Sequence, residues 1–267
     1  MFAQIKHMAI VSENYALLGR FYEAAFRMRT SKRARPESAV VVGDGYVGMN
    51  INPRRAGRQA GFDHFGFEVA DVETVFARMK ANYPAVSVLK RPSNRPFAGL
   101  STHDPAGNVF DLSQRGMENR TDVYEDGDWK QDRYIHHFAL RTVIPESVAR
   151  FYVDVFELKP LEKPAGDPNF YLSDGKVILI VMPWNINDYQ GSGIERPALD
   201  HIGFKVESVE GFKKDLQALV GRNPSLSPGP VGCGPEGEAR LRLFAKCPYG
   251  KHHLSDLDGV LIDVSDS

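Results

Sequence analysis

A pattern that begins with histidine recurs four times along the chain and constrains the fold more than any other feature. Each copy reads histidine, apolar, small, apolar, and the copies begin at His7, His64, His137 and His201. Alternation of this kind is typical of a β-strand, in which every second residue lies on the same face. A pattern that recurs at separated places indicates repeated structural modules rather than one irregular fold.

Each of these strands is followed by a segment in which apolar residues recur three and four positions apart, which predicts a helix. In the second module, Asp71 is the expected N-cap. The first and third helical segments share the string Arg-Phe-Tyr, at residues 20–22 and 150–152. Two or three further strand-like runs follow each helix, separated by turn sequences such as those at residues 43–45 and 173–175.

The modules are too short to bury a sheet face alone, so they are expected to pair. Residues 116–133 carry many charges and few apolar side chains, as a linker does. The predicted fold class is therefore α+β, with four βαβββ modules paired into two domains, residues 1–115 and 134–267. Each pair is expected to form a curved mixed sheet around a concave site.

Composition excludes several classes of partner. The 33 Lys and Arg residues nearly balance the 34 Asp and Glu residues, and no basic stripe is present, which argues against nucleic acid and anionic membranes. The apolar runs are far shorter than the roughly 20 residues that span a bilayer. The first ten residues lack the features of a signal peptide, and the two cysteines match neither a CxxC pair nor zinc-finger spacing, as expected of unpaired thiols, so a cytoplasmic protein is expected.

Modules two and four end in a strand that contains a carboxylate. Asp111 and Asp263 each lie seven residues after the aspartate that opens the preceding turn. Both fall within apolar strands, where a charge needs a partner or a metal. Each half of the chain thus offers two histidines and one aspartate. The first candidate metal site is composed of His137, His201 and Asp263, and the second of His7, His64 and Asp111.

Two imidazoles and one carboxylate with open positions opposite them form the ligand set of non-haem Fe(II) oxygenases, and Mn(II) or Zn(II) also fits. The strands opened by histidine and the Asp-Pro-Ala-Gly-Asn turn at residues 104–108 resemble the vicinal oxygen chelate superfamily. This superfamily includes glyoxalase I, type I extradiol dioxygenases, fosfomycin-resistance proteins and bleomycin-binding proteins. The four-module form most resembles the extradiol dioxygenases, which implies a metal centre at His137, His201 and Asp263.

The sequence departs from the dioxygenase pattern in its acidic ligand and in the residues around it. The family uses Glu where both halves here have Asp, and His253 occupies the place of the family's tyrosine. His253, His252 and Tyr249 are nevertheless the candidate acid–base groups, since imidazole titrates near neutral pH. For His136, strand alternation predicts the outer face.

The resemblance implies a metal-dependent enzyme, with an extradiol-type dioxygenase that cleaves a catechol-like aromatic using Fe(II) and O₂ as the first hypothesis. The alternatives are a metal-dependent lyase, isomerase or transferase of the glyoxalase or fosfomycin-resistance kind, and a metal-free binding protein. The expected partner is a small molecule with vicinal oxygens, and a homo-oligomer is compatible with the sequence. No organic cofactor is expected, and fold alone does not decide among these functions.

Overall fold

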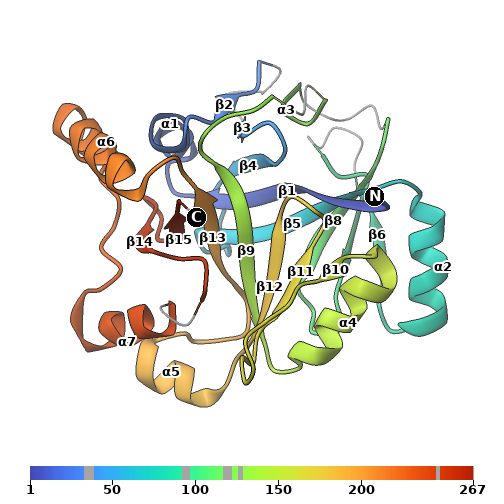
Figure 1. Ribbon diagram of the computed structural model, residues 1–267. Helices are drawn as coiled ribbons and strands as arrows, with labels where there is room; N and C mark the ends of the chain where they lie inside the picture. Colours follow the sequence, from blue (N-terminus) through green and yellow to red (C-terminus); the bar gives the residue numbers. More distant parts are fainter. Residues whose placement is uncertain (33–38, 92–96, 117–121, 126–128, 245–246, 267) are drawn as a thin grey trace.

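Two mixed β-sheets, one from each half of the chain, form the framework of the protein (Figure 1). The computed structural model describes residues 1–32, 39–91, 97–116, 122–125, 129–244 and 247–266. The first sheet has eight strands in the order β2-β3-β4-β1-β5-β8-β7-β6, and the second has seven in the order β10-β11-β12-β9-β13-β15-β14. In each sheet the strands opened by histidine lie side by side at the centre, as the paired-module prediction requires.

The strands of the first sheet belong to modules one and two. They are β1 (Ala3–Ser12), β2 (Arg29–Thr30), β3 (Val40–Gly43), β4 (Gly48–Pro53), β5 (Gly61–Val69), β6 (Val88–Lys90), β7 (Leu100–His103) and β8 (Val109–Gln114). The strands of the second sheet are β9 (Tyr134–Thr142), β10 (Lys159–Pro160), β11 (Phe170–Ser173), β12 (Ile178–Pro183), β13 (Leu199–Lys205), β14 (His252–Ser255) and β15 (Leu261–Ser265). In place of a counterpart to β6, the second sheet has a single β-bridge between Gly229 and Ser255.

The predicted module helices are present, and local sequence explains where they begin. They are α1 (Tyr15–Phe26), α2 (Val72–Asn82), α4 (Pro145–Phe156) and α6 (Val209–Arg222). The side chains of Asn14, Asp71 and Ser208 accept hydrogen bonds from the first turns of α1, α2 and α6, so the expected cap at Asp71 is confirmed. Arg27 and Glu157 end α1 and α4 in the same left-handed conformation, at φ 58°.

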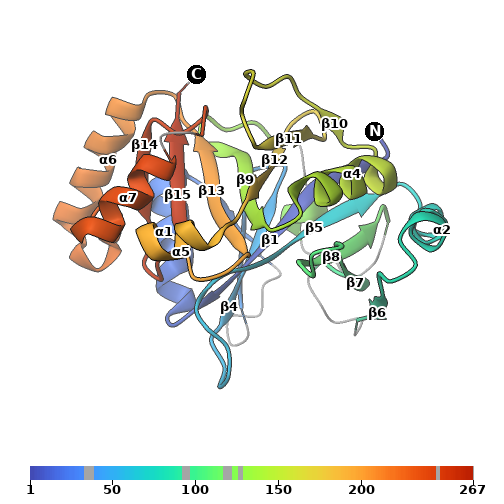
Figure 2. The same ribbon diagram turned by 90° about the horizontal axis from the view of Figure 1, so that it is seen from below.

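The helices join the two halves through one apolar core. Phe26 of α1 stacks on Phe204 of β13 with ring centroids 3.8 Å apart, and Phe156 of α4 stacks on Phe67 of β5 at 4.4 Å. Each half therefore places a helix against the sheet of the other. Figures 1 and 2 show α1 beside α6 at one end of the molecule and α2 beside α4 at the other.

Buried hydrogen bonds repeat this exchange. The hydroxyl of Tyr22 donates to Asp256 at 2.8 Å, and that of Tyr152, its counterpart in the second half, donates to Asp104 at 3.0 Å. Both acceptors open the turn before the strand with the candidate carboxylate ligand. The turn that precedes each acidic ligand is thereby held by a tyrosine from the other half.

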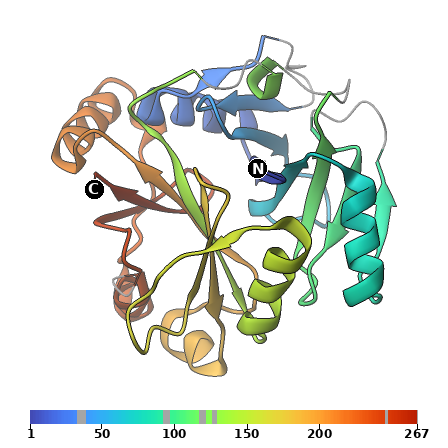
Figure 3. The same cartoon turned by 45° about the vertical axis from the view of Figure 1, so that its right-hand side comes forward.

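Four further helical segments lie outside the module pattern. They are α3 (Asp122–Glu125), α5 (Ile186–Ser192), the 3₁₀ helix η1 (Pro224–Leu226) and α7 (Gly234–Phe244). Figure 3 shows α5 and α7 together at one end of the second sheet. Among the residues that the structure describes, no helix combines the length and apolarity needed to cross a membrane.

Candidate metal centres

The first centre brings together His7 of β1, His64 of β5 and Asp111 of β8. The Nε2 atoms of the two histidines are 3.3 Å apart. Oδ2 of Asp111 lies 3.2 Å from Nε2 of His64 and 4.0 Å from Nε2 of His7. Two ligand atoms that each lie about 2.1 Å from one ion can be at most about 4.2 Å apart, so all three distances are compatible with a single bound cation.

The second centre repeats this arrangement with His137 of β9, His201 of β13 and Asp263 of β15. Oδ2 of Asp263 is 3.5 Å from Nε2 of His137 and 3.4 Å from Nε2 of His201. All three side chains are at most 1% exposed. The structure therefore brings both predicted trios together, each on one face of its own sheet.

The donor atoms of the second centre pass a test that does not depend on the family. Nε2 of His137, Nε2 of His201 and Oδ2 of Asp263 are buried and lack any hydrogen-bond partner. Buried polar atoms without partners are rare, and each needs an explanation. Here the atoms face one another at ligand spacing, and a divalent cation would satisfy them together. The residues present fit a metal ion.

Strand register explains why the recurring pattern needs a small residue two positions after each histidine. Gly66 pairs with both His7 and Asp111, and Gly203 pairs with both His137 and Asp263. A Cβ atom on Gly203 would lie 1.9 Å from Cε1 of His137. The imidazole thus occupies the space above the glycine, and the strand pairing places histidine and carboxylate on either side of it.

Outer carboxylates orient one histidine of each centre. Nδ1 of His64 donates to Asp63 at 2.7 Å, and Asp63 in turn accepts from Arg58. In the second centre, Nδ1 of His201 donates to Asp200 at 2.7 Å, and Asp200 accepts from Arg141 at 2.5 Å. Such contacts fix the tautomer so that Nε2 faces the metal, and they increase the basicity of the ligand.

The acidic ligands are also held by their neighbours across the sheet. Asp111 accepts a hydrogen bond from the hydroxyl of Ser101 on β7. In the corresponding pair of the second half, Nδ1 of His253 on β14 donates to Oδ1 of Asp263 at 2.5 Å. His253, a candidate acid–base group, therefore lies beside the second centre. Its hydrogen bond holds the carboxylate of Asp263 in position.

The electrostatics of both centres follow from charge pairing in a buried setting. Burial alone lowers the pKa of His64, but the carboxylates of Asp111 and Asp63 outweigh it and raise that pKa to about 9. The same competition raises the pKa of His201 to about 10. The imidazoles in return lower the pKa values of Asp111 and Asp263, against burial, so both carboxylates are ionised at neutral pH.

The first centre opens into a cavity of about 370 Å³. His64 and Asp111 form part of its wall, and three arginines, Arg55, Arg58 and Arg91, line the rest together with smaller polar and apolar residues. Arg58 pairs with Asp63. Within the part of the chain that the structure describes, Arg55 and Arg91 pair with no carboxylate, and Nε of Arg91 is buried without a hydrogen-bond partner.

Three other residues singled out in the sequence, Tyr249, His136 and His252, lie at different places relative to the second centre. The ring of Tyr249 lies 5.3 Å from that of His137 and 5.1 Å from that of His136, which is partly buried. His252 lies on the other face of β14, with its ring 6.5 Å from Phe212 of α6. The structure thus brings Tyr249 and His253 to the second centre and places His252 apart from it.

Sequence reasoning missed three residues that the fold brings to the centres. Cys247 joins His137, His201 and Asp263, with all four ligand atoms within 4.8 Å of one another. Although burial raises the pKa of its thiol, the two imidazoles lower it to about 6. The hydroxyl of Tyr124, from the segment between the two sheets, is hydrogen-bonded to Nδ1 of His7 at 2.6 Å.

The third missed residue is Asn50 on β4. It pairs with Ala9, two residues after His7, just as Asp111 pairs with Gly66, two residues after His64. Its Oδ1 is buried without a hydrogen-bond partner. A signal for Asn50 was present in the module repeat, whereas Cys247 and Tyr124 lie in segments with no repeated pattern.

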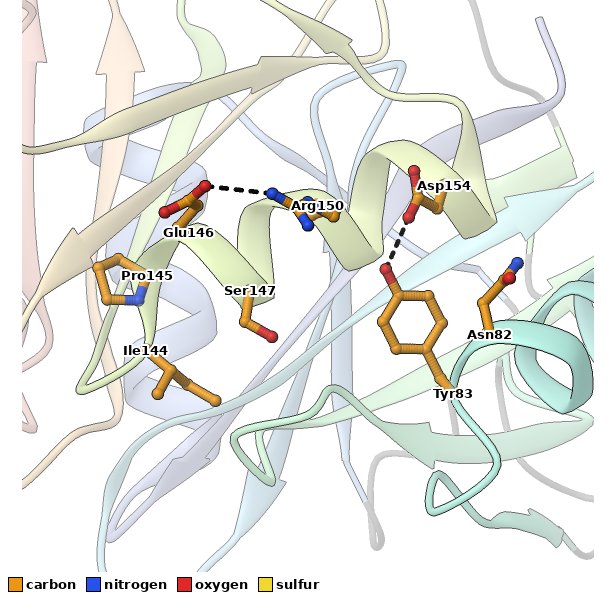
Figure 4. Close-up of a pocket in the computed structure, with 8 residues that line it drawn as sticks. All are labelled: Asn82, Tyr83, Ile144, Pro145, Glu146, Ser147, Arg150 and Asp154. Atoms are coloured by element: carbon orange, nitrogen blue, oxygen red, sulfur yellow. Dashed lines mark hydrogen bonds and ion pairs between the residues drawn. The ribbon is translucent and has the colours of Figure 1, made fainter.

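A larger hollow of about 760 Å³ lies between α4 and the end of α2, away from both centres (Figure 4). Four of its polar side chains form two pairs. Tyr83 donates to Asp154 at 2.8 Å, and Arg150 donates to Glu146 at 3.1 Å. The residues that line this hollow come from both halves of the chain and include none of the candidate ligands. The hollow is therefore part of the junction between the halves.

Comparison with known proteins agrees with this architecture. A family model described as the Glyoxalase/Bleomycin resistance protein/Dioxygenase superfamily matches residues 4–112. No curated protein sequence matches the chain. The chain has the fold of that superfamily, and the resemblance inferred from its motifs is confirmed.

Solved structures with this fold include glyoxalases and dioxygenases. A Mn(II)-bound glyoxalase from Novosphingobium aromaticivorans is 15% identical, with a TM-score of 0.64 over 98% of this chain and 81% of that one. A variant of homoprotocatechuate 2,3-dioxygenase from B. fuscum is 15% identical, with a TM-score of 0.62 over 100% of this chain and 71% of that one. A xylose isomerase-like TIM barrel/4-hydroxyphenylpyruvate dioxygenase fusion protein is 13% identical, with a TM-score of 0.63 over 99% of this chain. The chain spans only 49% of the fusion protein.

Proposed function

We propose that this protein is a metal-dependent enzyme of the vicinal oxygen chelate type whose reaction takes place at His7, His64 and Asp111. The observation that carries this proposal is the arginine-lined cavity of about 370 Å³ that reaches His64 and Asp111. Three protein donors leave coordination positions for a substrate, as catalytic metal sites do. A bound divalent ion would supply Lewis acidity and a template on which two neighbouring substrate oxygens are held.

The charges of the cavity indicate an anionic substrate. Two neutral imidazoles and one carboxylate carry a single negative charge, so a divalent ion at the first centre leaves a net charge of +1. Arg55 and Arg91, which pair with no carboxylate among the described residues, add two more positive charges to the wall. A carboxylate on the substrate would pair with these guanidinium groups and orient the chelating oxygens towards His64 and Asp111.

Within this class, the reaction proposed first is an extradiol-type ring cleavage of a carboxylated catechol with Fe(II) and O₂. The support is the donor set of two histidines and one carboxylate on one face, which is the set used by non-haem Fe(II) oxygenases. Arg55 and Arg91 would bind the anionic group of the substrate, and Asp63 would hold the imidazole of His64 in position. Phe97, which stacks on His7 at 4.7 Å, covers the buried side of the centre.

The decisive experiment is oxygen uptake by Fe(II)-loaded protein on a panel of catechols with and without a ring carboxylate. Carboxylated catechols should be consumed, and D111N should abolish the activity while D263N retains it. R91Q and R55Q should each lower kcat/KM for the carboxylated substrate about 10- to 100-fold, the worth of one charge-assisted hydrogen bond, with little effect on unsubstituted catechol. Uptake that survives in D111N but not in D263N would place the reaction at the second centre and contradict this proposal.

A redox-neutral lyase, isomerase or transferase is the second candidate, and Asn50 favours it. Its buried carbonyl oxygen, at the register position equivalent to Asp111, offers a neutral fourth donor. If protein with Fe(II), Mn(II) or Zn(II) at the first centre consumes no oxygen on any catechol, the dioxygenase reaction is excluded and this candidate replaces it. If metal analysis finds no ion bound to protein purified without chelators, and none binds on addition, the chain is a metal-free binding protein.

A further inference from the structure

The second centre differs from the first in having a thiol within reach of its donors. The Sγ atom of Cys247 and the ligand atoms of His137, His201 and Asp263 all lie within 4.8 Å of one another. Cys247 is only 5% exposed. Its backbone N–H donates to the carbonyl of Phe244, the last residue of α7, at 2.8 Å.

A buried cysteine alone would be an ordinary core residue. The independent observation is the set of three unpartnered atoms on the histidines and the aspartate beside it. Gly250, three residues after Cys247, also lies close to the cluster, since a Cβ atom there would be 2.7 Å from Oδ2 of Asp263. The thiol therefore faces a group of donors that already lacks partners.

We propose that Cys247 is the fourth ligand of the second centre, which then binds a thiolate-preferring divalent ion, Zn(II) or Co(II), in a closed four-donor site. Four-coordinate sites filled by protein donors are typical of structural zinc, whereas catalytic sites keep a position open. Two imidazoles, one thiolate and one carboxylate carry two negative charges, which neutralise a divalent ion completely. Thiolate also favours zinc over magnesium, calcium or manganese.

The first centre provides the contrast within the same chain. Both cysteines of the sequence, Cys233 and Cys247, lie in the second half. The first centre has instead Phe97 against His7 and a cavity at His64. The proposal goes beyond the catalytic function, because it assigns the second centre to holding α7 and the last strands together rather than to turnover.

The inference includes one covalent change, the exchange of the thiol proton for the metal. The S–H bond of Cys247 breaks, its electron pair forms the bond to the ion, and the proton passes to the solvent.

The test uses Co(II) as the probe, because a thiolate bonded to cobalt gives a charge-transfer band in the near ultraviolet. Full-length protein loaded with two equivalents of Co(II) should show this band, as should D111N, which lacks the first centre. C247S should lose the band. Its affinity for Zn(II) at the second centre should fall by more than roughly 10- to 100-fold, which is the cost of losing a partner outside the coordination sphere. C233S, which removes the exposed cysteine, is the matched control and should retain both properties.

A second measurement keeps the proposal falsifiable if C247S does not fold. X-ray absorption of Zn(II)-loaded D111N should reveal one sulfur neighbour at about 2.3 Å among nitrogen and oxygen neighbours. A spectrum with nitrogen and oxygen neighbours only would overturn the assignment of Cys247, as would a charge-transfer band that persists in C247S. Neither measurement depends on turnover, so the assignment and the proposed reaction fail or succeed separately.

Discussion

Gly203 lies directly opposite His137 in the second sheet, and the imidazole fills the place that a side chain on Gly203 would take. Cε1 of His137 would be 1.9 Å from a Cβ atom at that position. The same pairing relates Gly66 to His7 in the first sheet. The repeated pattern is therefore a packing requirement of the histidine clusters, in which a small residue makes room for the histidine of the neighbouring strand.

The variant G203A should disrupt the second centre selectively. Its methyl group must displace the imidazole of His137, at a cost typical of overpacking, about 1–3 kcal/mol of unfolding free energy. Metal analysis should show loss of the ion at the second centre and retention of the ion at the first. G221A is the control, because a Cβ atom at Gly221 on α6 meets nothing within 4 Å. Full metal content in G203A would show that His137 is not a ligand.

Removing the carboxylate that orients His64 should weaken only the first centre. In D63N a neutral amide replaces the carboxylate that accepts the hydrogen bond from Nδ1 of His64. The metal affinity of the first centre should therefore fall about 10- to 100-fold. The matched variant D200N should do the same at the second centre. Titration of both variants with Co(II) measures the two affinities. Equal weakening of both centres by D63N would contradict the assignment of Asp63 to one of them.

The two variants should differ in stability, since the arginines behind them differ in exposure. Arg141 is 7% exposed and Arg58 is 48% exposed. D200N leaves a buried guanidinium without its carboxylate and should cost several kcal/mol of unfolding free energy, whereas D63N should cost about 1 kcal/mol or less. Denaturant unfolding of the metal-free proteins measures this difference. A cost for D63N equal to that for D200N would mean that exposure does not govern these pairs.

Asp256 should make the protein lose stability as pH rises through the mildly acidic range. Burial raises the pKa of Asp256 to about 6, against the hydrogen bonds that it accepts from Tyr22 and the backbone. Its pKa in the unfolded chain is about 3.9, so the folded state binds the extra proton between these values. The resulting stabilisation is fully present below about pH 4 and is lost as pH rises through 6, on the order of 2–3 kcal/mol.

Unfolding free energies of the wild type and D256N at pH 4 and pH 7 measure this contribution. The asparagine cannot titrate, so the wild type should lose on the order of 2–3 kcal/mol more than D256N between the two pH values. Other titrating groups, including the metal ligands, are common to both proteins and cancel in the comparison. Parallel pH profiles would show that Asp256 has the same pKa in the folded and unfolded states.

Tyr152 should contribute to stability by linking the halves. Y152F removes the hydroxyl that donates to the buried Asp104 at 3.0 Å and should lower the unfolding free energy by about 1–3 kcal/mol, the cost of an unmade buried hydrogen bond. Metal content should not change, because the hydrogen bond between Tyr152 and Asp104 is buried and involves none of the candidate metal ligands. Y189F is the control, since Tyr189 is 51% exposed. A loss of the first-centre ion in Y152F would show that the turn at Asp104 also positions Asp111.

The sequence by itself determined the module pattern, the module helices and the six candidate ligand residues, because these depend on local rules. Strand alternation puts a histidine and a small residue on one face, and the repeat places each trio at equivalent positions. The tertiary structure decided which additional groups reach the centres. Cys247, Tyr124, Arg55 and Arg91 come from turns and connecting segments, whose paths are set by packing between distant residues and leave no periodic trace in the sequence. The physical reason that two similar trios acquire different surroundings is therefore the course of these segments over each sheet.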